Sequence, residues 1–169
     1  LTNVRMLNNK ANDPDHSDEH GYGGAIAGVN DTAKIFITNC YFGGNYAVKG
    51  GVASYGTYTV NNSTVSGNSA TAWGGVAYRG VWIAKNCDFN VNSGGTGGIS
   101  DYSTWSVENC RFVGNSAASA GLSCRSNWTV KNCIFIDNSA AAGDDSNWTI
   151  TNSTFWNTMG GIYSTTYDN

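Results

Sequence analysis

The nine residues Val107-Glu108-Asn109-Cys110-Arg111-Phe112-Val113-Gly114-Asn115 decide the fold, because their pattern recurs along the chain. The same order of an apolar residue, Asn, Cys, Phe and a closing Asn returns at Val130–Asn138 and occurs earlier at Ile37–Asn45. Looser copies begin at Leu1, Val60, Ala84 and Ile150. A pattern with a period of about 23 residues is typical of a solenoid in which each copy forms one coil.

Two further landmarks accompany each copy. A Gly-Gly step precedes the motif, as in Gly50-Gly51-Val52 and Gly74-Gly75-Val76, and an aromatic strand follows that step. The aromatic position is occupied by Trp82, Trp105, Trp128 and Trp148. Short strands that alternate apolar and polar residues cannot each bury a face alone, so they must stack. The sequence therefore predicts an all-β right-handed parallel β-helix of about six to seven coils, with three short strands per coil.

Stacking places like residues over one another. The predicted interior contains a ring column formed by Phe42, Phe89, Phe112, Phe135 and Phe155. A turn column of amides is formed by Asn45, Asn68, Asn92, Asn115 and Asn138, whose side chains can hydrogen-bond from coil to coil. These ladders are predicted to stabilise the fold rather than to carry function.

Composition excludes several classes of protein. Nine Lys and Arg against twelve Asp and Glu give a net charge of −3, which argues against nucleic-acid binding. No apolar run approaches the roughly 20 residues of a transmembrane helix. The length indicates one domain over residues 1–169. Because the chain starts inside a motif and stops in mid-coil, we expect part of a longer solenoid or a protomer stacked end to end in a fibre.

The Gly23-Gly24-Ala25-Ile26 step and the recurring Phe-x-x-Asn resemble the paired GGAI and FxxN repeats of the polymorphic outer-membrane protein family. The resemblance covers nearly the whole chain. It implies a pectate-lyase-like right-handed β-helix, a secreted or cell-surface location and a function in adhesion. The chain departs from that family in having Cys rather than Ser after the motif Asn in four coils.

An acidic insertion at residues 12–22 is the candidate metal site. It contains Asp13, Asp15, His16, Asp18, Glu19 and His20. Alternating acidic residues are typical of the start of a calcium loop, and two histidines beside carboxylates are able to ligate zinc. The alternative is a solvated loop that projects from the rod, because a complete calcium loop with a closing bidentate Glu is missing.

The cysteines form a second column. Cys87, Cys110 and Cys133 are predicted to stack in successive coils, with Cys40 facing a serine and Cys124 as the fifth. Adjacent coils would bring their Cα atoms within disulfide range, but an odd number cannot pair completely. Disulfide pairing and buried thiols both remain open at this point.

Six asparagines lie in N-x-S/T sequons. Asn30 is expected in a turn, Asn127 and Asn147 share one outward column, and Asn61 is a further candidate for an N-linked glycan. Two more, Asn62 and Asn152, belong to the motif turn and are expected to be structural.

Catalytic residues are not apparent. The charged residues that an enzyme on this fold would gather in one groove are predicted to lie in different outward columns or as isolated neighbours: Asp88, Arg111, Asp101, Arg79 and Arg125. Asp88 and Arg111 are expected to form a surface ion pair. Threonines beside the Trp strand resemble the flat faces of ice-binding β-helices, but Val81 and Ile83 interrupt them.

These observations predict a non-catalytic extracellular structural protein, namely the glycosylated β-helix rod of a cell-surface or filamentous, fibril-forming glycoprotein. The alternative is a binding module similar to an adhesin or autotransporter passenger. A carbohydrate-active enzyme and an ice-binding protein are less favoured. No cofactor is expected apart from Ca²⁺ or Zn²⁺ in the acidic insertion.

Overall fold

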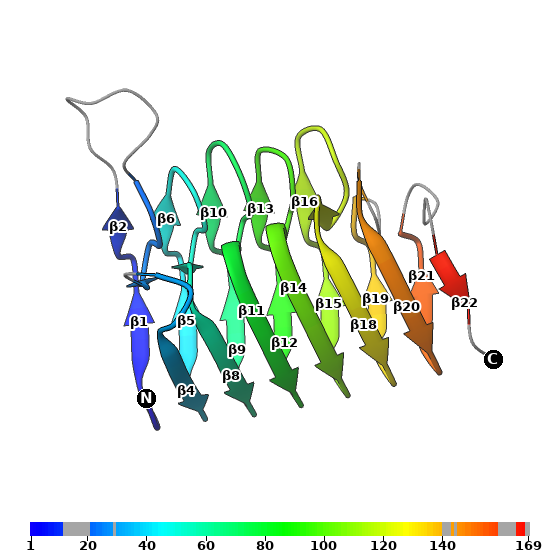
Figure 1. Ribbon diagram of the computed structural model, residues 1–169, viewed down its shortest axis with the longest axis horizontal. Helices are drawn as coiled ribbons and strands as arrows, with labels where there is room; N and C mark the ends of the chain where they lie inside the picture. The colour runs from blue at the N-terminus through cyan, green and yellow to red at the C-terminus, as the bar shows by residue number, and fades with distance from the viewer. Residues whose placement is uncertain (12–20, 29, 140–142, 144, 159–164, 168–169) are drawn as a thin grey trace.

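The chain folds as a stack of parallel coils. The computed structural model describes residues 1–11, 21–28, 30–139, 143, 145–158 and 165–167. These residues form 22 β-strands and no α-helix. Every ladder between the described strands is parallel. Figure 1 shows the strands succeeding one another along the long axis, so the predicted β-helix is confirmed.

Each coil contributes to three sheets. The seven-stranded sheet contains β1 (Arg5–Leu7), β5 (Tyr41–Gly43), β9 (Thr64–Ser66), β12 (Asp88–Asn90), β15 (Arg111–Val113), β19 (Ile134–Ile136) and β21 (Thr154–Trp156). The five-stranded sheet contains β2 (Lys10–Ala11), β6 (Tyr46–Ala47), β10 (Ser69–Ala70), β13 (Ser93–Gly94) and β16 (Ser116–Ala117). The largest sheet contains β3 (Ile26–Ala27), β4 (Lys34–Thr38), β7 (Ala53–Ser54), β8 (Thr57–Asn61), β11 (Ala77–Lys85), β14 (Ser100–Glu108), β17 (Ser123–Cys124), β18 (Asn127–Lys131), β20 (Asn147–Thr151) and β22 (Thr165–Tyr167). The described residues make about five turns, slightly fewer than the six to seven expected.

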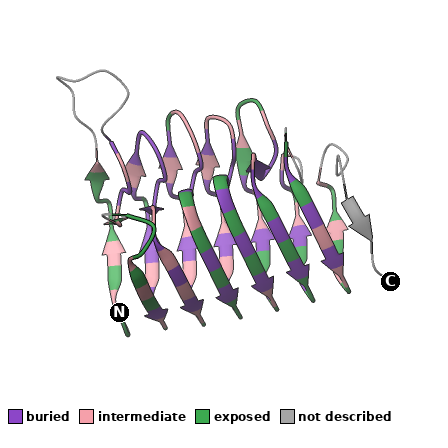
Figure 2. Ribbon diagram, viewed as in Figure 1, coloured by how far each residue is buried: buried purple, intermediate pink, exposed green. Residues whose placement is uncertain are grey.

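The register agrees with the predicted columns. Phe89 pairs with Phe112, and Phe112 with Phe135, in adjacent strands of the seven-stranded sheet. Their ring centroids lie 4.8 and 4.7 Å apart, and the rings are nearly parallel. Burial alternates along the long strands, as Figure 2 shows, because successive side chains point to opposite faces of a sheet.

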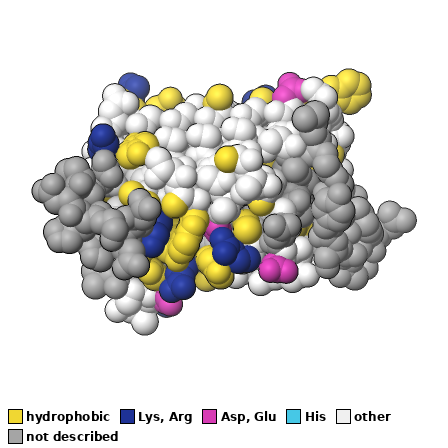
Figure 3. Space-filling view, turned by 90° about the horizontal axis from the view of Figure 1, so that it is seen from above, with side chains coloured by type: hydrophobic (Ala, Val, Ile, Leu, Met, Phe, Trp, Pro, Cys, Tyr) yellow, Lys and Arg dark blue, Asp and Glu magenta, His cyan; other side chains and the backbone are white. Residues whose placement is uncertain are grey.

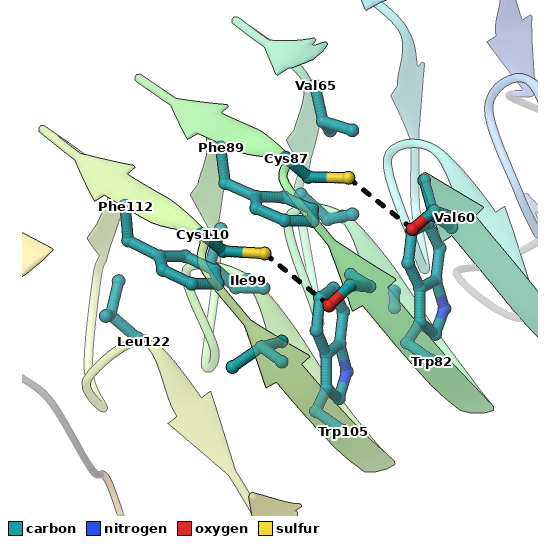
Figure 4. Packing of buried hydrophobic residues seen from close by; sticks show 14 of the residues in the cluster. Val60, Val65, Trp82, Cys87, Phe89, Ile99, Trp105, Cys110, Phe112 and Leu122 are labelled. Carbon is teal, nitrogen blue, oxygen red and sulfur yellow. Dashed lines mark hydrogen bonds between the residues drawn. The ribbon is translucent and has the colours of Figure 1, made fainter. Parts of the chain in front are cut away.

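A stack of indoles fills the other side of the interior. The ring centroids of Trp82, Trp105, Trp128 and Trp148 succeed one another at 4.8, 4.9 and 4.7 Å. Figure 4 shows two of these indoles facing the phenylalanine column across the core. The Nε1 atom of Trp128 donates a hydrogen bond to Ser100, at 2.9 Å. The Nε1 atoms of Trp82 and Trp105 are buried and have no acceptor in the structure.

The asparagine ladder closes one turn of each coil. Asn92 is fully buried, and its Nδ2 donates to the backbone oxygen of Val65 and to Oδ1 of Asn115, at 2.9 and 3.0 Å. Its own Oδ1 accepts bonds from the backbone N–H and Nδ2 of Asn68, both at 3.0 Å. The same pattern repeats in neighbouring coils. Each buried amide is therefore satisfied by the coils beside it, as buried polar groups must be.

The cysteine column uses its thiols as hydrogen-bonding groups. Cys110 donates from Sγ to the carbonyl oxygen of Glu108, at 3.3 Å, and Ser63 donates in the same way to the carbonyl of Asn61, at 2.7 Å. Both residue types also accept from the next coil, since Ser63 Oγ accepts from the N–H of Cys40 and Cys133 Sγ accepts from that of Cys110. Figure 4 also draws the longer contacts, both of 3.6 Å, from Sγ of Cys87 to the carbonyl oxygen of Val60 and from Sγ of Cys110 to that of Ala84. Cys40, Cys87, Cys110 and Cys133 are buried thiols, not disulfides.

Candidate functional site: the Tyr/Arg corner

One turn of the coil holds bulky residues in left-handed backbone in four successive coils, whereas Val91 is the single such residue at the other turns of the described ranges. The residues Ser54, Tyr78, Asp101 and Cys124 pair from coil to coil and form one column. The residue after each of them therefore falls in a neighbouring column, which consists of Tyr55, Arg79, Tyr102 and Arg125. The four have φ values of 54, 47, 52 and 46°. We call this column of four residues the Tyr/Arg corner. It lies where the chain enters the long strands of the largest sheet.

The left-handed backbone at this corner is unfavourable for bulky side chains. A residue with a Cβ costs roughly 1–2 kcal/mol there, and only Gly, Asn and Asp adopt the conformation readily. The turn at the motif uses asparagine in every described coil: Asn3, Asn39, Asn62, Asn86, Asn109, Asn132 and Asn152. Strained backbone of this kind concentrates at functional sites. The corner is for that reason the strongest candidate site on the rod.

Aromatic rings surround the corner. Tyr22 lies 5.6 Å from Tyr55 between ring centroids, and Trp73 lies 4.8 Å from Tyr78. Tyr78 in turn contacts Tyr102 edge to face, at 6.2 Å. Desolvation by burial raises the pKa of Tyr78 to about 12, although the neighbouring Arg79 opposes the rise. The Tyr78 hydroxyl therefore stays protonated at neutral pH.

Arg125 is held firmly at one end of the corner. Its Nε and Nη2 atoms bind the two carboxylate oxygens of Asp101, at 3.1 and 2.7 Å, and the Asp101 side chain is fully buried. Thr96 donates a further hydrogen bond to the same carboxylate. The guanidinium lies 4.1 Å from the ring centroid of Tyr102 and donates to its hydroxyl, at 2.9 Å. Although burial opposes it, the hydrogen bond and charge of Asp101 raise the pKa of Arg125.

Lys49 lies within the ring cluster and is only 7% exposed. Its Nζ atom is 4.6 Å from the ring of Trp73 and 5.0 Å from that of Tyr22, whose hydroxyl is 3.5 Å away. Within the described ranges, no carboxylate forms an ion pair with this ammonium. Aromatic faces take that role through cation–π attraction, which is stronger where water is excluded.

Arg79 is the exposed cation of the corner. Its guanidinium carbon lies 5.6 Å from the ring centroids of both Tyr78 and Tyr102. In the part of the chain that the structure describes, Arg79 has no carboxylate within ion-pair distance. The guanidinium also hydrogen-bonds the side chain of Tyr55, and its remaining donors are available to a ligand.

A shallow groove of about 420 Å³ runs beside the corner. Its lining residues are Asp31, Gly56, Arg79, Gly80, Val81, Tyr102 and Thr104. Figure 3 shows Lys and Arg side chains interleaved with hydrophobic ones on this side of the rod. The groove combines a cation, a carboxylate, a hydroxyl and apolar walls, which is a set suited to binding a small polar molecule.

The candidate metal residues are not part of this site. Asp13, Asp15, His16, Asp18, Glu19 and His20 lie outside the described residues. Elsewhere, in the ranges that the structure covers, no group of three His, Cys, Asp or Glu side chains is placed to hold a metal ion. A Ca²⁺ or Zn²⁺ site in the insertion stays a prediction.

The sequons lie at the surface with different local structures. Asn30 is exposed, and its Oδ1 accepts bonds from the N–H and hydroxyl of Thr32, at 3.1 and 2.6 Å. Asn127 and Asn147 are exposed and pair across adjacent strands, with Nδ2 of Asn147 donating to Oδ1 of Asn127 at 3.1 Å. Asn61 is half-buried, and its backbone oxygen accepts from Ser63. Glycosylation at these positions stays a prediction.

The expected positions of the charged residues were wrong in part. Asp101 is buried and not outward, and it binds Arg125; Arg79 and Arg125 share one column instead of lying apart. Alternation counted back from the buried Trp105 places Asp101 on the inward side, so the signal was present in the sequence. Alignment on the Gly-Gly step likewise places Arg79 and Tyr102 at one position. The predicted Asp88–Arg111 ion pair is confirmed, at 3.4 Å.

The fold and site define the class as a parallel β-helix with an aromatic and cationic corner. Residues 25–169 match the family model of the right handed beta helix region, and the chain belongs to that family. The match also agrees with the predicted handedness. No curated protein matches the chain, and no solved structure matches it. Among the described residues, no helix has the length and apolar character needed to cross a membrane.

Proposed function

We propose that the chain is a non-catalytic extracellular rod of a cell-surface or filamentous glycoprotein, and that it binds a partner through the Tyr/Arg corner. The observation that carries this proposal is the row of left-handed Tyr55, Arg79, Tyr102 and Arg125. The backbone of this turn would be less strained with Gly or Asn. Binding of a partner by the large aromatic and cationic side chains would explain why the turn has these residues and not Gly or Asn.

The hydrogen bonding of the buried Asp101 supports binding rather than catalysis at that carboxylate. A glycoside hydrolase or lyase on this fold would need a carboxylate or base that is available to transfer a proton. The buried carboxylate at the corner, Asp101, instead accepts bonds from Arg125 and Thr96. Such a pair orders the surface but leaves Asp101 without a role in proton transfer.

The resemblance of the repeats to those of surface adhesins agrees with this proposal. A β-helix is suited to adhesion because its stacked ladders resist bending while its side faces remain accessible. Candidate glycans at Asn30, Asn127 and Asn147 agree with an extracellular location.

The test is binding of purified protein to intact cells and to immobilised glycans. We expect the double variant Arg79→Gly/Tyr102→Gly to lose binding while it still folds, because Gly relieves the left-handed strain as the side-chain contacts are lost. The matched control is Asp88→Asn/Arg111→Gln, which removes an exposed pair on the seven-stranded sheet. Equal binding by the corner variant, or release of reducing ends from a bound polysaccharide, would contradict the proposal.

End-to-end assembly into fibres is a second candidate. It is favoured by the regular asparagine ladder, in which the donor and acceptor of each rung match those of the next. Such a pattern is one that a neighbouring copy can extend. Native mass measurement with electron microscopy tests it, and a monomer at all concentrations would exclude it.

A further inference from the structure

We infer that the groove beside the Tyr/Arg corner binds a neutral hexose unit of a glycan, with Arg79 donating hydrogen bonds to its hydroxyls and Asp31 accepting them. This inference rests on the proposed binding function and names the chemical class of the ligand. It is carried by the residues that line the groove and by their balance of charge.

The size of the groove fits a single sugar unit. A volume of about 420 Å³ lies near the lower end of the range of roughly 300–1,000 Å³ for small-molecule sites. Two glycines, Gly56 and Gly80, form part of the lining. A Cβ at Gly80 would lie 3.1 Å from the oxygen of Gly56, so the coils approach closely at this side of the groove.

The two charged groups offer complementary hydrogen bonding. Asp31 and Arg79 both line the groove, yet they form no ion pair with each other. A guanidinium only donates and a carboxylate only accepts, whereas a sugar hydroxyl does both. A hydroxylated ring between the two groups would engage each of them, and hydrogen bonds to charged groups are the stronger ones.

The charge balance selects neutral sugars over sugar acids. One carboxylate and one guanidinium line the groove, so its net charge is close to zero. An acidic sugar would gain attraction from Arg79 but would be repelled by Asp31 at short range. The positive charge of Arg125 does not add to the charge of the groove, because Arg125 forms an ion pair with Asp101.

The Tyr102 side chain and the backbone around Asp31 are ordered before a ligand arrives. Tyr102 is 43% exposed, but its ring packs against Arg125 and its hydroxyl accepts a bond from the same guanidinium. Asp31 lies in a turn closed by bonds from Thr32 to Asn30. Two residues after Asp31, the backbone oxygen of Ala33 accepts a bond from the N–H of Thr57. Side chains that are already fixed lose little entropy when they bind.

A peptide is a poorer fit. Peptide and protein partners need a buried aromatic or aliphatic anchor that enters a desolvated pocket. The apolar part of this groove consists of Val81 and one side of Tyr102, and the groove is open along its length.

The experiment measures binding of neutral gluco-, galacto- and manno-oligosaccharides by isothermal titration calorimetry, with oligogalacturonates as the acidic comparison. The protein for this experiment is prepared without a glycan at Asn30, so that no attached sugar competes for the groove. Asp31→Asn keeps the shape of the side chain and removes its charge, and Arg79→Gln replaces the guanidinium with a shorter, neutral amide. We expect each to weaken neutral-sugar binding at least about tenfold. Arg111→Gln and Asp88→Asn are the matched controls.

We also expect the affinity for neutral sugar to change little with added salt, because no net charge is neutralised on binding. Preference for the acidic oligosaccharides, or equal losses in the control variants, would overturn the inference. If cells bind through the corner while none of these oligosaccharides does, the sugar assignment fails and the proposed function stands. If neither cells nor oligosaccharides bind, both fail.

Discussion

The interior ladders and the Tyr/Arg corner are both columns that pass from coil to coil, but the interior repeats a residue type and the corner repeats a backbone conformation. In the interior the residue itself repeats, as Trp82, Trp105, Trp128 and Trp148 do. At the corner the backbone repeats while the side chain alternates between Tyr and Arg over four coils, and Asp145, with a φ of 54°, takes the equivalent position after Arg125. Packing between coils explains the first kind of column. The corner shows that one backbone conformation can carry different side chains. It is the part of the surface where the side chain changes from coil to coil while the backbone does not.

The largest effect is expected from breaking the interior ladder. Asn92→Ala removes a buried amide that bonds with Asn68, Val65 and Asn115. The unfolding free energy should fall by roughly 3 kcal/mol or more, since several buried polar groups lose their partners. Denaturant unfolding measures this loss. Asn90→Ala, a change at a half-buried position two residues away, should cost within about 0.5 kcal/mol; equal losses would contradict the role of the ladder.

Completing the interior pattern should stabilise the protein. Ser100, which accepts a bond from Trp128, pairs with Ala77 in the preceding coil, and Trp105 pairs with Trp128. Ala77→Ser therefore places a hydroxyl where the buried Nε1 of Trp105 has no acceptor. We expect a gain of about 1 kcal/mol in unfolding free energy and a downfield shift of the Trp105 indole proton. A loss of stability would show that the hydroxyl does not fit beside this indole.

A substitution at the corner should change the stability of the protein less than a substitution at the motif turn. Arg79→Gly relieves the left-handed strain and gives up cation–π contacts of similar size, so stability should change by less than about 0.5 kcal/mol. Asn86→Ala at the motif turn, where φ is 53°, should cost about 1 kcal/mol. Thermal unfolding of the two variants compares the columns directly. A large loss in Arg79→Gly would mean that the corner is structural.

The smallest effect concerns an exposed charge column. The hydrogen bond and charge of Lys85, with a smaller contribution from Lys131, lower the pKa of Glu108 below its ordinary 4.5. A lowered folded-state pKa contributes stability above the unfolded pKa, and that contribution is lost as pH falls through the folded value. Lys85→Met should raise the pKa of Glu108 in an NMR titration, and salt should diminish the difference. An unchanged pKa would show that the pair is not formed in solution.

The sequence sufficed to predict the ladders because every coil repeats the residues that pack. Alignment on the Gly-Gly step brings Arg79 and Tyr102 to one position, but it did not suffice to identify the corner as a site, because the repeated property is a φ angle and the residue type changes. The ring cluster brings Tyr22, Lys49 and Trp73 together from turns, whose path is not determined by strand alternation. Asp31 reaches the groove from another coil, and no local pattern connects it with Arg79. Contacts of this kind depend on how successive turns are offset, which periodicity does not encode.

The interchange of Cys and Ser in one column has a consequence for where the protein can work. Since the thiols of Cys87, Cys110 and Cys133 act as hydrogen-bonding groups, the fold does not depend on covalent cross-links. The redox potential of the surroundings is consequently not a condition for assembly of the coils. A serine at any of these positions would preserve the bonding without offering a target for oxidants.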